Sequence, residues 1–415
     1  MAQLSNDCFA FGGPLLTVDE ARTLIVERLS AVVATETVSL SEADGRVLAE
    51  PLTAPLDLPP FANSAVDGYA VRHADLGPGR TVMPVVGRIP AGRSPSGTEA
   101  ARQAVRIFTG APMPEGFDTV FMQEDVEARD REVVLPAGLK RGANRRPKGE
   151  DLARGAVALE AGRRITSREV TLMAALGYAE VPVRRPLRVA LFSTGDEIVS
   201  PGEPLPGAGL YDANRFMLAS LLRRAGCSIT DLGILRDRRD VVAEALGAAS
   251  AAHDLLITSG GVSTGEEDHV KSAVEAVGRL SFWRVGIKPG RPVALGVVRG
   301  KPFIGLPGNP VAVFVTFVQI ARALVARLSG EVYAPPVPLP VEAGFAYRKK
   351  EGRREYVRVR LERQERRMVA HKHPREGAGV ITSLTETDGL VELAEAVTRV
   401  EVGETVGFLP YGVLI

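Results

Sequence analysis

The strongest constraint on the fold is the alternation of short apolar runs with helical patterns between residues 187 and 328. Apolar runs of this length, separated by helices and bounded by polar loops, are typical of strands buried in a parallel sheet. The pattern therefore predicts an α/β unit with a mostly parallel sheet. Strands are expected at residues 187–192, 228–235, 254–258, 281–285, 293–298 and 303–306, and helices at residues 214–225, 239–250, 270–277 and 311–328.

The strand expected at residues 254–258 leads into a loop of glycine, serine and threonine at residues 259–265, which three acids follow. Glycine leaves the backbone accessible, so several N–H groups can approach one anion. A helix N-terminus behind the loop adds partial positive charge, which favours phosphate. The acids would repel phosphate alone, but they suit a site with a divalent cation between them and the phosphate. A tight turn with solvated acids is the simpler alternative.

Four of the expected strands end in polar or glycine-containing loops that carry Glu197, Asp237, Asp268 and Asn309. In an open parallel sheet, the loops that follow the strands line one crevice, and ligands bind there. A binding site is therefore predicted at this edge of the sheet.

The remaining sequence predicts additional domains, because 415 residues are too many for a single core. Prolines cluster near residue 55, short strands with glycine and proline follow, and a new helical pattern begins at Ser167. Pro335 and Pro336 precede a β-rich tail. The expected domains are a discontinuous mixed α+β front domain (14–54 and 143–184), an inserted β-rich domain (55–142), the α/β domain (185–333) and a C-terminal β-barrel-like domain (334–415).

Charge and cysteine content exclude several functions. A formal net charge of +1 gives no electrostatic footprint for nucleic acid or an anionic membrane. The two cysteines form no disulfide framework or metal-ligand spacing, which is consistent with a reducing cytoplasm. No signal peptide pattern opens the sequence. The apolar segment 311–328 contains two arginines, so we expect a buried helix and not a membrane span.

Three further stretches place polar groups in turns. Residues 63–70 set Asp67 before an apolar strand, and residues 108–112 set the Thr109 hydroxyl beside a glycine. Residues 142–151 combine three cations with two carboxylates, one of them Asp151. Each stretch alone also fits an ordinary turn or a solvated loop.

Together these stretches resemble the molybdopterin molybdenumtransferase family, which includes MoeA and the gephyrin E-domain. The resemblance covers nearly the whole chain beyond about residue 14. It rests on seven segments in order, at residues 63–70, 108–112, 146–151, 193–197, 258–263, 288–292 and 306–310.

The resemblance implies an elongated, four-domain homodimer whose central α/β domain is MogA/MoaB-like. It implies an enzyme that takes adenylated molybdopterin and molybdate, uses Mg²⁺, releases AMP and delivers molybdenum cofactor. A molybdopterin adenylyltransferase is the implied substrate donor, and a cofactor carrier or molybdoenzyme is the implied acceptor. The implied location is cytoplasmic, without nucleic acid or membrane partners.

The resemblance also implies roles for individual residues. The acidic active-site positions match Asp67, Asp151, Glu197, Asp237 and Asp268, of which Asp237 and Asp268 are the expected metal ligands. The molybdate positions match Arg284, Lys288 and Arg358. The substrate positions match Thr109, Ser193, Thr194, Gly195, Ser259, Gly260, Gly261, Val262, Ser263, Pro307, Gly308 and Asn309. No nucleophilic side chain is evident, so positioning and electrostatic neutralisation are expected to supply most of the catalysis.

The sequence departs from the family pattern at two positions. Arg284 stands where the family often has lysine. The positive charge is kept, but a compact ammonium group is replaced by a planar guanidinium with several donors in a fixed geometry. Ala378 stands between two glycines where the family often has serine, so one hydroxyl is missing from the expected oxyanion site. Thr382, Ser383 or backbone N–H groups are candidates to replace it.

Two alternative functions share this domain type. A molybdopterin adenylyltransferase needs only the α/β domain, so the long front section and the tail argue against it. A non-catalytic scaffold has no need of its acids, yet all five carboxylates are present. Molybdate and tungstate are both tetrahedral dianions of nearly equal size, and both are candidate oxyanions.

Overall fold

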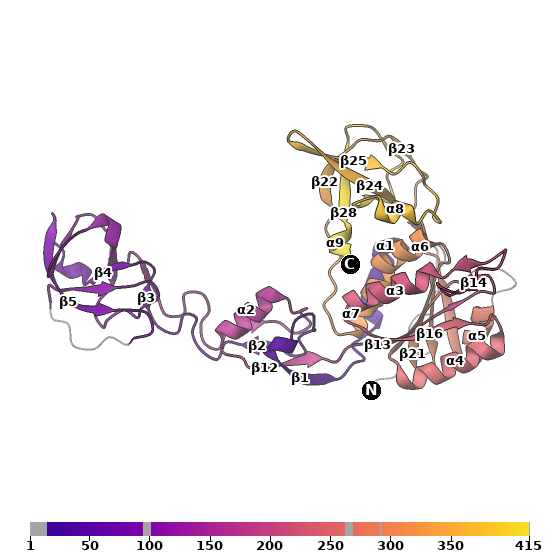
Figure 1. Cartoon of the computed structure of the whole chain (residues 1–415), viewed down its shortest axis with the longest axis horizontal. Coiled ribbons are helices and arrows are strands. Elements are labelled where there is room, and N and C mark those ends of the chain that lie inside the picture. The colour runs from indigo at the N-terminus through magenta and orange to yellow at the C-terminus, as the bar shows by residue number, and fades with distance from the viewer. Residues whose placement is uncertain (1–14, 94–100, 262–268, 291–292, 415) are drawn as a thin grey trace.

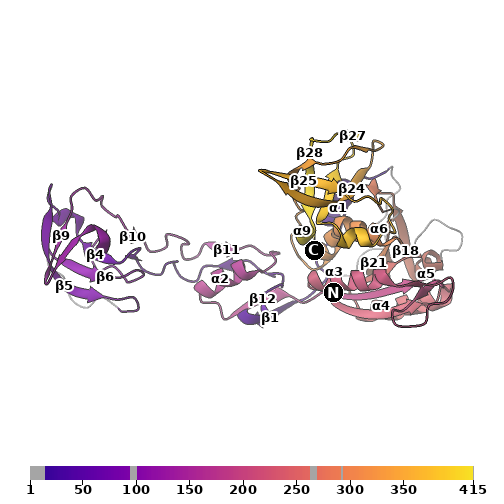
Figure 2. The same cartoon turned by 45° about the horizontal axis from the view of Figure 1, so that its top comes forward.

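The computed structural model describes residues 15–93, 101–261, 269–290 and 293–414. The chain is elongated, with an all-β part at one end, a small mixed part in the middle, and an α/β part beneath a β-barrel at the other end (Figure 1). Two stretches of chain connect the all-β part to the middle part, as expected for a domain inserted into another (Figure 2).

The α/β part contains a six-stranded sheet in the order β16-β13-β17-β21-β20-β18. The first four strands run parallel, and the pairings of β21 with β20 and of β20 with β18 are antiparallel, so only β20 runs in the opposite direction, as a mostly parallel sheet allows. The strands are β13 (Arg188–Thr194), β16 (Ser228–Leu235), β17 (Leu255–Ser259), β18 (Gly278–Trp283), β20 (Val293–Val298) and β21 (Lys301–Leu306). The strand expected at 281–285 starts and ends earlier, because pairing with β20 runs from Gly278 to Trp283.

Helices cover both faces of this sheet, since alternate residues of its central strands enter different cores. On β13, Val189 and Leu191 pack with α3 (Ala213–Arg224), whereas Ala190 and Phe192 pack with α4 (Arg239–Ala252) and α5 (His269–Val277). This explains why the strands are apolar at successive positions.

One long helix fills the core on the α3 side. It consists of α6 (Pro310–Thr316), the π-helical turn η4 (Phe317–Ala321) and α7 (Arg322–Leu328). The helix is long and apolar enough to cross a membrane, but 89% of its most apolar window is buried inside the protein. Helix α1 (Val18–Arg28) packs against α7, so this segment of the expected front domain lies with the α/β part.

The middle part is a small mixed unit made from two distant stretches of sequence. Strand β1 (Thr35–Ser39) pairs antiparallel with β12 (Glu180–Arg184), and β2 (Leu52–Thr53) pairs with β11 (Val157–Leu159). Helix α2 (Ser167–Ala175) begins at a capping box in which the Thr166 and Glu169 side chains each bond the other's backbone N–H.

The inserted part is a six-stranded sheet in the order β7-β4-β6-β5-β9-β8. A two-stranded pairing of β3 (Asn63–Ser64) with β10 (Arg145–Arg146) lies beside it. The sheet strands are β4 (Gly68–Val71), β5 (Thr81–Ile89), β6 (Ala104–Ile107), β7 (Thr119–Met122), β8 (Glu127–Arg129) and β9 (Glu132–Leu135).

The C-terminal part closes into a five-stranded barrel, because β24 pairs with both β25 and β26. Its strands are β22 (Leu339–Ala343), β24 (Arg354–Gln364), β25 (Arg367–Lys372), β26 (Gly389–Leu393) and β28 (Thr405–Pro410). Strand β19 (Ile287–Lys288), which comes from the α/β segment, adds to β24 and connects the barrel to the rest of the molecule.

An ion-pair network connects the middle part to the α/β part. Glu331 follows α7 and accepts from Arg164 of the middle part at 2.5 Å and from Arg322 of α7 at 3.0 and 3.1 Å. Burial alone would raise the pKa of Glu331, but the hydrogen bonds from the two arginines outweigh it and hold the pKa below its usual value.

We predict that Glu331→Gln lowers the free energy of unfolding by about 1–3 kcal/mol. This is less than the 3–5 kcal/mol for a fully buried pair, because each arginine keeps about a fifth of its side chain exposed. Since the folded pKa is depressed, the pair stabilises the protein above the unfolded pKa of about 4.3, and this contribution is lost as pH falls through the folded pKa. Denaturant unfolding at several pH values measures both effects. The exposed Glu160→Gln is the control, and equal losses in the two variants would contradict the prediction.

Candidate active site

A cavity of about 480 Å³ lies at the edge of the α/β sheet where β13, β16, β17 and β21 end. We call it the glycine pocket. The structure brings most of the predicted phosphate-binding and acidic residues of the α/β part together here. Its lining includes Ser193, Thr194, Gly195, Glu197, Asp237, Ser259, Gly260, Gly261, Pro307, Gly308 and Asn309, together with Ile198, Leu210, Asp212 and Asn214.

Glycine is required at the base of this pocket. Gly261 has a φ of +63°, and a Cβ there would lie 2.5 Å from Val270 and 2.6 Å from Thr194. Only a residue without a side chain fits this backbone conformation and this close packing. The loop after β17 therefore brings main chain, and not side chains, to the pocket wall.

Two buried oxygen atoms beside the pocket have no hydrogen-bond partner among the described residues. They are Oγ of Ser193 and Oδ1 of Asn214. The amide of Asn214 is held in place, since its Nδ2 donates to the carbonyl of Gly308 at 2.6 Å. Buried polar atoms are normally paired, so these oxygens indicate a polar ligand in the pocket.

The carboxylates of the glycine pocket fit Mg²⁺. Asp237 is half-buried and accepts from the Thr194 hydroxyl at 3.4 Å, while Glu197 lies exposed against Gly195. Within the described ranges, no group of three or more acidic, histidine or cysteine side chains is placed to enclose a metal. Two carboxylates suit Mg²⁺, which usually binds through one or two carboxylates, water and substrate phosphates. Asp268, the other expected ligand, lies outside the described residues.

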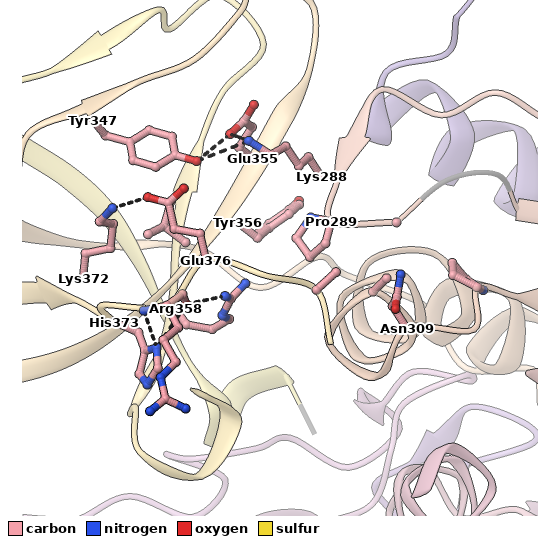
Figure 3. A pocket seen from close by; sticks show the side chains of 16 residues that line it. Lys288, Pro289, Asn309, Tyr347, Glu355, Tyr356, Arg358, Lys372, His373 and Glu376 are labelled. Atoms are coloured by element: carbon pink, nitrogen blue, oxygen red, sulfur yellow. Dashed lines mark hydrogen bonds and ion pairs between the residues drawn. The ribbon is translucent and has the colours of Figure 1, made fainter. Parts of the chain in front are cut away.

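A second cavity, of about 290 Å³, lies between the α/β part and the barrel, and we call it the cation pocket (Figure 3). Strands β19 and β24 supply Lys288, Glu355 and Arg358. The other lining residues come from both parts, from the loops and helix after β19 and β21 and from the barrel strands and loops. Its lining comprises Lys288, Pro289, Gly290, Pro307, Asn309, Ala312, Tyr347, Glu355, Tyr356, Val357, Arg358, Lys372, His373, Arg375, Glu376 and Ala378.

Carboxylates restrain two of the cations in this pocket. Oε2 of Glu355, a buried residue, accepts from Lys288 Nζ at 2.9 Å and from the Tyr347 hydroxyl at 2.8 Å. Burial, and then this hydrogen bond, raises the pKa of Tyr347, so the phenol stays protonated and donates. Lys372 pairs in the same way with Glu376, and that bond lowers the pKa of the Glu376 carboxyl.

Arg358 is the buried cation without a carboxylate among its described partners. Its side chain donates to the carbonyls of Arg375 at 3.0 Å and Gly377 at 3.4 Å, and its Nε has no partner within the described residues. Burial lowers the pKa of the guanidinium, which nevertheless remains charged at neutral pH. A buried charge without a counter-ion is costly, so this arginine is set up to bind an anion.

The lining of the cation pocket carries a formal net charge of +2. Four cations line it (Lys288, Arg358, Lys372 and Arg375) against two carboxylates (Glu355 and Glu376). This charge matches a dianion. Pro307 and Asn309 line both pockets, so the two cavities adjoin at the loop after β21.

Two other predicted site residues, Asp67 and Thr109, meet in the inserted part. The Asp67 carboxylate accepts from the backbone N–H of Thr109 at 2.8 Å and from its hydroxyl at 2.7 Å, and these bonds lower the pKa of Asp67. Asp151 is exposed, and its N–H donates to Leu58. Strand β3 and the strands of the inserted sheet lie at the opposite end of the chain from the two pockets (Figure 1).

Some predicted residues are not part of either pocket. Arg284 is exposed and lines neither cavity. Val262 and Ser263, like Asp268, lie outside the described residues. Five residues that line the pockets were not predicted from the sequence: Asn214, Tyr347, Glu355, Lys372 and Glu376. No helical spacing marks Lys372 and Glu376 as a pair, because Lys372 ends β25 and Glu376 lies in the loop after it.

Three successive parts of the chain match known protein families. Residues 16–177 match the MoeA N-terminal region (domain I and II), residues 190–327 a probable molybdopterin binding domain, and residues 340–411 the MoeA C-terminal region (domain IV). The chain is 38% identical over 404 residues to the molybdopterin molybdenumtransferase of Haemophilus influenzae, a match that covers 97% of this chain and 100% of that protein. The chain belongs to the molybdopterin molybdenumtransferase (MoeA) family.

Other members of the MoeA family agree with this assignment. Molybdopterin molybdenumtransferase 2 of Mycobacterium tuberculosis is 34% identical over 399 residues, covering 93% of this chain and 97% of that protein. The crystal structure of the molybdopterin biosynthesis MoeA protein from Pyrococcus horikoshii has a TM-score of 0.81 at 27% identity, covering 96% of this chain and 100% of the other. The resemblance and fold class inferred from the sequence are thus confirmed.

We predict that Ala378→Ser is tolerated and tightens oxyanion binding in the cation pocket. Ala378 lines the cavity, so a hydroxyl there adds one donor to a charged ligand. Such a bond contributes at most about 1.5–3 kcal/mol, less the cost of displacing water, so we expect up to about a tenfold gain in affinity. Calorimetric titration with molybdate measures it, with Ala312→Ser as a lining control. A tenfold loss of affinity for Ala378→Ser would contradict the placement of this residue beside the oxyanion.

Proposed function

We propose that this protein is a transferase that inserts molybdate into adenylated molybdopterin, with Mg²⁺-dependent release of AMP. The observation that carries the proposal is the adjoining pair of pockets. One has a charge suited to a tetrahedral dianion. The other has a glycine wall and an unpartnered Ser193 hydroxyl that can donate to a phosphate. The relatives at 34–38% identity carry the name molybdopterin molybdenumtransferase, which supports the same reaction class.

In this proposal, the residues of each pocket bind a different part of the reactants. Arg358 and Lys372 hold the oxyanion in the cation pocket, and Glu355 fixes Lys288 and Tyr347 at its wall. The glycine pocket holds the phosphates of the pterin ligand against Ser193, Ser259 and the loop at Gly260. Asp237 and Glu197 would hold the cation, which when bound neutralises phosphate charge. Among the described residues, neither Ser193 nor Ser259 has a general base as hydrogen-bond partner, so we attribute rate acceleration to positioning and charge neutralisation.

The adenylyltransferase alternative is not favoured. It needs the glycine pocket alone, whereas this chain adds a barrel whose β24 completes a second, cationic cavity. A protein that bound only the nucleotide and the pterin would have no use for a buried, uncompensated Arg358 beside them.

The purified protein is expected to release AMP from adenylated molybdopterin when molybdate and Mg²⁺ are supplied, and chelation of Mg²⁺ should stop the release. We predict that Asp237→Asn reduces the rate at least tenfold, since half of the described carboxylate pair is lost. Its melting temperature should stay close to wild type, because a half-exposed side chain contributes about 0.5 kcal/mol or less.

Chromatographic assay of AMP measures the outcome. Asp240→Asn serves as the matched control, because this nearby acid pairs with Arg238 in solvent and lines neither pocket. Wild-type turnover in Asp237→Asn would show that Asp237 has no role in the active site. Release of pyrophosphate from ATP, in place of AMP from the pterin, would restore the adenylyltransferase alternative.

We further propose that two copies of the chain share each active site in a homodimer. The motif residues Asp67 and Thr109 lie at the far end of the chain from both pockets, which is explained if they act on the pockets of the second copy. In a two-fold dimer each site then combines the inserted part of one copy with the α/β part of the other. The pterin substrate would come from a molybdopterin adenylyltransferase, and the product would pass to a carrier or a molybdoenzyme, in the cytoplasm.

Co-expression of an Asp67→Ala chain with an Asp237→Ala chain tests the sharing. A mixed dimer would contain one site with both lesions and one with none. With random pairing about half the dimers are mixed, so roughly a quarter of wild-type AMP release should return. Activity that stays at the level of the separate variants would show that each site lies within one chain.

A further inference from the structure

Arg358, the buried cation of the cation pocket, is held by the loop that follows β25. Its side chain donates to the carbonyls of Arg375 at 3.0 Å and Gly377 at 3.4 Å. We call residues 373–379 the carbonyl loop. Because Arg358 has no carboxylate among its described partners, the position of its guanidinium depends on where these loop carbonyls lie.

The α/β part anchors the far end of the carbonyl loop. The Ala378 carbonyl accepts from the backbone N–H of Val311 at 2.9 Å, in the first turn of α6. Two glycines, Gly377 and Gly379, flank this anchor and leave the backbone freer than other residues would. The near end of the loop, which carries the Arg375 carbonyl, therefore needs a separate anchor in the barrel.

The ring of His373 provides this anchor (Figure 3). His373 is 7% exposed and lines the cation pocket, and its backbone N–H donates to the Arg358 carbonyl at 2.9 Å. The backbone N–H of Arg375 donates to Nδ1 of the ring at 3.2 Å, and the Arg375 carbonyl lies 3.1 Å from the same nitrogen. The other nitrogen, Nε2, lies 2.8 Å from Oε2 of Glu386, which follows α8 (Thr382–Thr385).

The two ring nitrogens of His373 have different partners and different tasks. A carboxylate only accepts, so Nε2 carries a proton and donates to Glu386. In a neutral ring Nδ1 then accepts from the N–H of Arg375, and in a charged ring it donates to the Arg375 carbonyl. In both states a polar atom at the δ position holds the main chain of Arg375, whose carbonyl accepts from Arg358.

The contact at Nδ1 matters more for the loop than the contact at Nε2. The Glu386 side chain is 59% exposed, so water competes for the carboxylate and screens its charge. The contact at Nδ1 joins a buried ring to the same peptide main chain that Arg358 contacts, and a buried polar atom that loses its partner is costly.

We propose that His373 is a positioning residue for oxyanion binding. Its Nδ1 fixes the main chain of Arg375, and the carbonyl held there sets where the Arg358 guanidinium lies in the cation pocket. This inference rests on the proposed function for the identity of the anion, molybdate. His373 acts through Arg358 and not by contact with the oxyanion, so loss of the δ contact displaces the donors without removing a charge.

Calorimetric titration of the intact protein with molybdate tests the role of each ring nitrogen. Asparagine places a polar atom near the position of Nδ1, whereas glutamine places one near that of Nε2. His373→Asn should therefore bind molybdate within about threefold of wild type, and His373→Gln should bind about tenfold or more weakly. His373→Leu, which keeps neither polar atom, should bind at least as weakly as His373→Gln.

Glu386→Ala is the matched control, because it removes the bond at Nε2 and leaves the contact at Nδ1 in place. It should bind molybdate within about threefold of wild type. In the AMP-release assay, His373→Gln should raise the KM for molybdate about tenfold and leave the KM for adenylated molybdopterin within about twofold of wild type. This split is expected because no residue of the carbonyl loop lines the glycine pocket.

A merely structural role of His373 gives a different pattern. If the ring only fills space and pairs with Glu386, the asparagine and glutamine variants should bind molybdate equally, or the Glu386→Ala control should lose as much affinity as His373→Gln. Either result would overturn the proposal, as would wild-type molybdate affinity in His373→Leu.

The positioning role and the proposed function fail separately. AMP release by a protein whose molybdate affinity does not depend on His373 would support the transferase and overturn the positioning role. Molybdate binding that depends on the δ position of residue 373, in a protein that releases no AMP from the pterin, would support the positioning role and overturn the transferase. A wild-type protein that binds no molybdate would overturn both.

Discussion

The short pairing between β19 and β24 is the interaction on which the cation pocket, and its contact with the glycine pocket, depend. It connects a two-residue strand of the α/β segment to the longest strand of the barrel, with Lys288 opposite Glu355 in register. The same two residues form an ion pair between a half-exposed lysine and a buried carboxylate, so backbone and side chains hold the two parts in one relative position. Without this joint the loop at Pro307 would border open solvent and not a second cavity.

The buried carboxylate of Glu355 in this joint carries a desolvation cost, and its partners line the cation pocket. Glu355 is 4% exposed, and a carboxylate so far from water is stable only when it is fully paired. Lys288 and Tyr347 satisfy it, which leaves Lys288 partly neutralised as an anion ligand. Under the proposed function, affinity for a dianion would therefore depend chiefly on Arg358, because burial makes its charge effective at short range. The joint that builds the cavity also determines which of its cations remains available.

The α/β part was predictable from sequence because its signals are local. Apolar runs and helical periodicity located β13, β16, β17 and β21 nearly to the residue, and the parallel-sheet rule brought their terminal loops to one edge. Glu355 and Tyr347 were not predictable, because they meet Lys288 only after the barrel closes and neither has a partner nearby in sequence. Helix α1 was assigned to the front part for a similar reason. Its apolar face does not indicate which core it enters, and that depends on the packing of α7.

The loop at Pro307 and Asn309 is a wall common to both cavities, and this has a thermodynamic consequence. Under the proposed function, a shift of that wall on filling one cavity would alter the shape of the other and couple the two ligands. By linkage such coupling would be reciprocal: whatever factor the oxyanion imposed on the affinity for the pterin, the pterin would impose on the affinity for the oxyanion. Each ligand would then bind weakly until the other had bound.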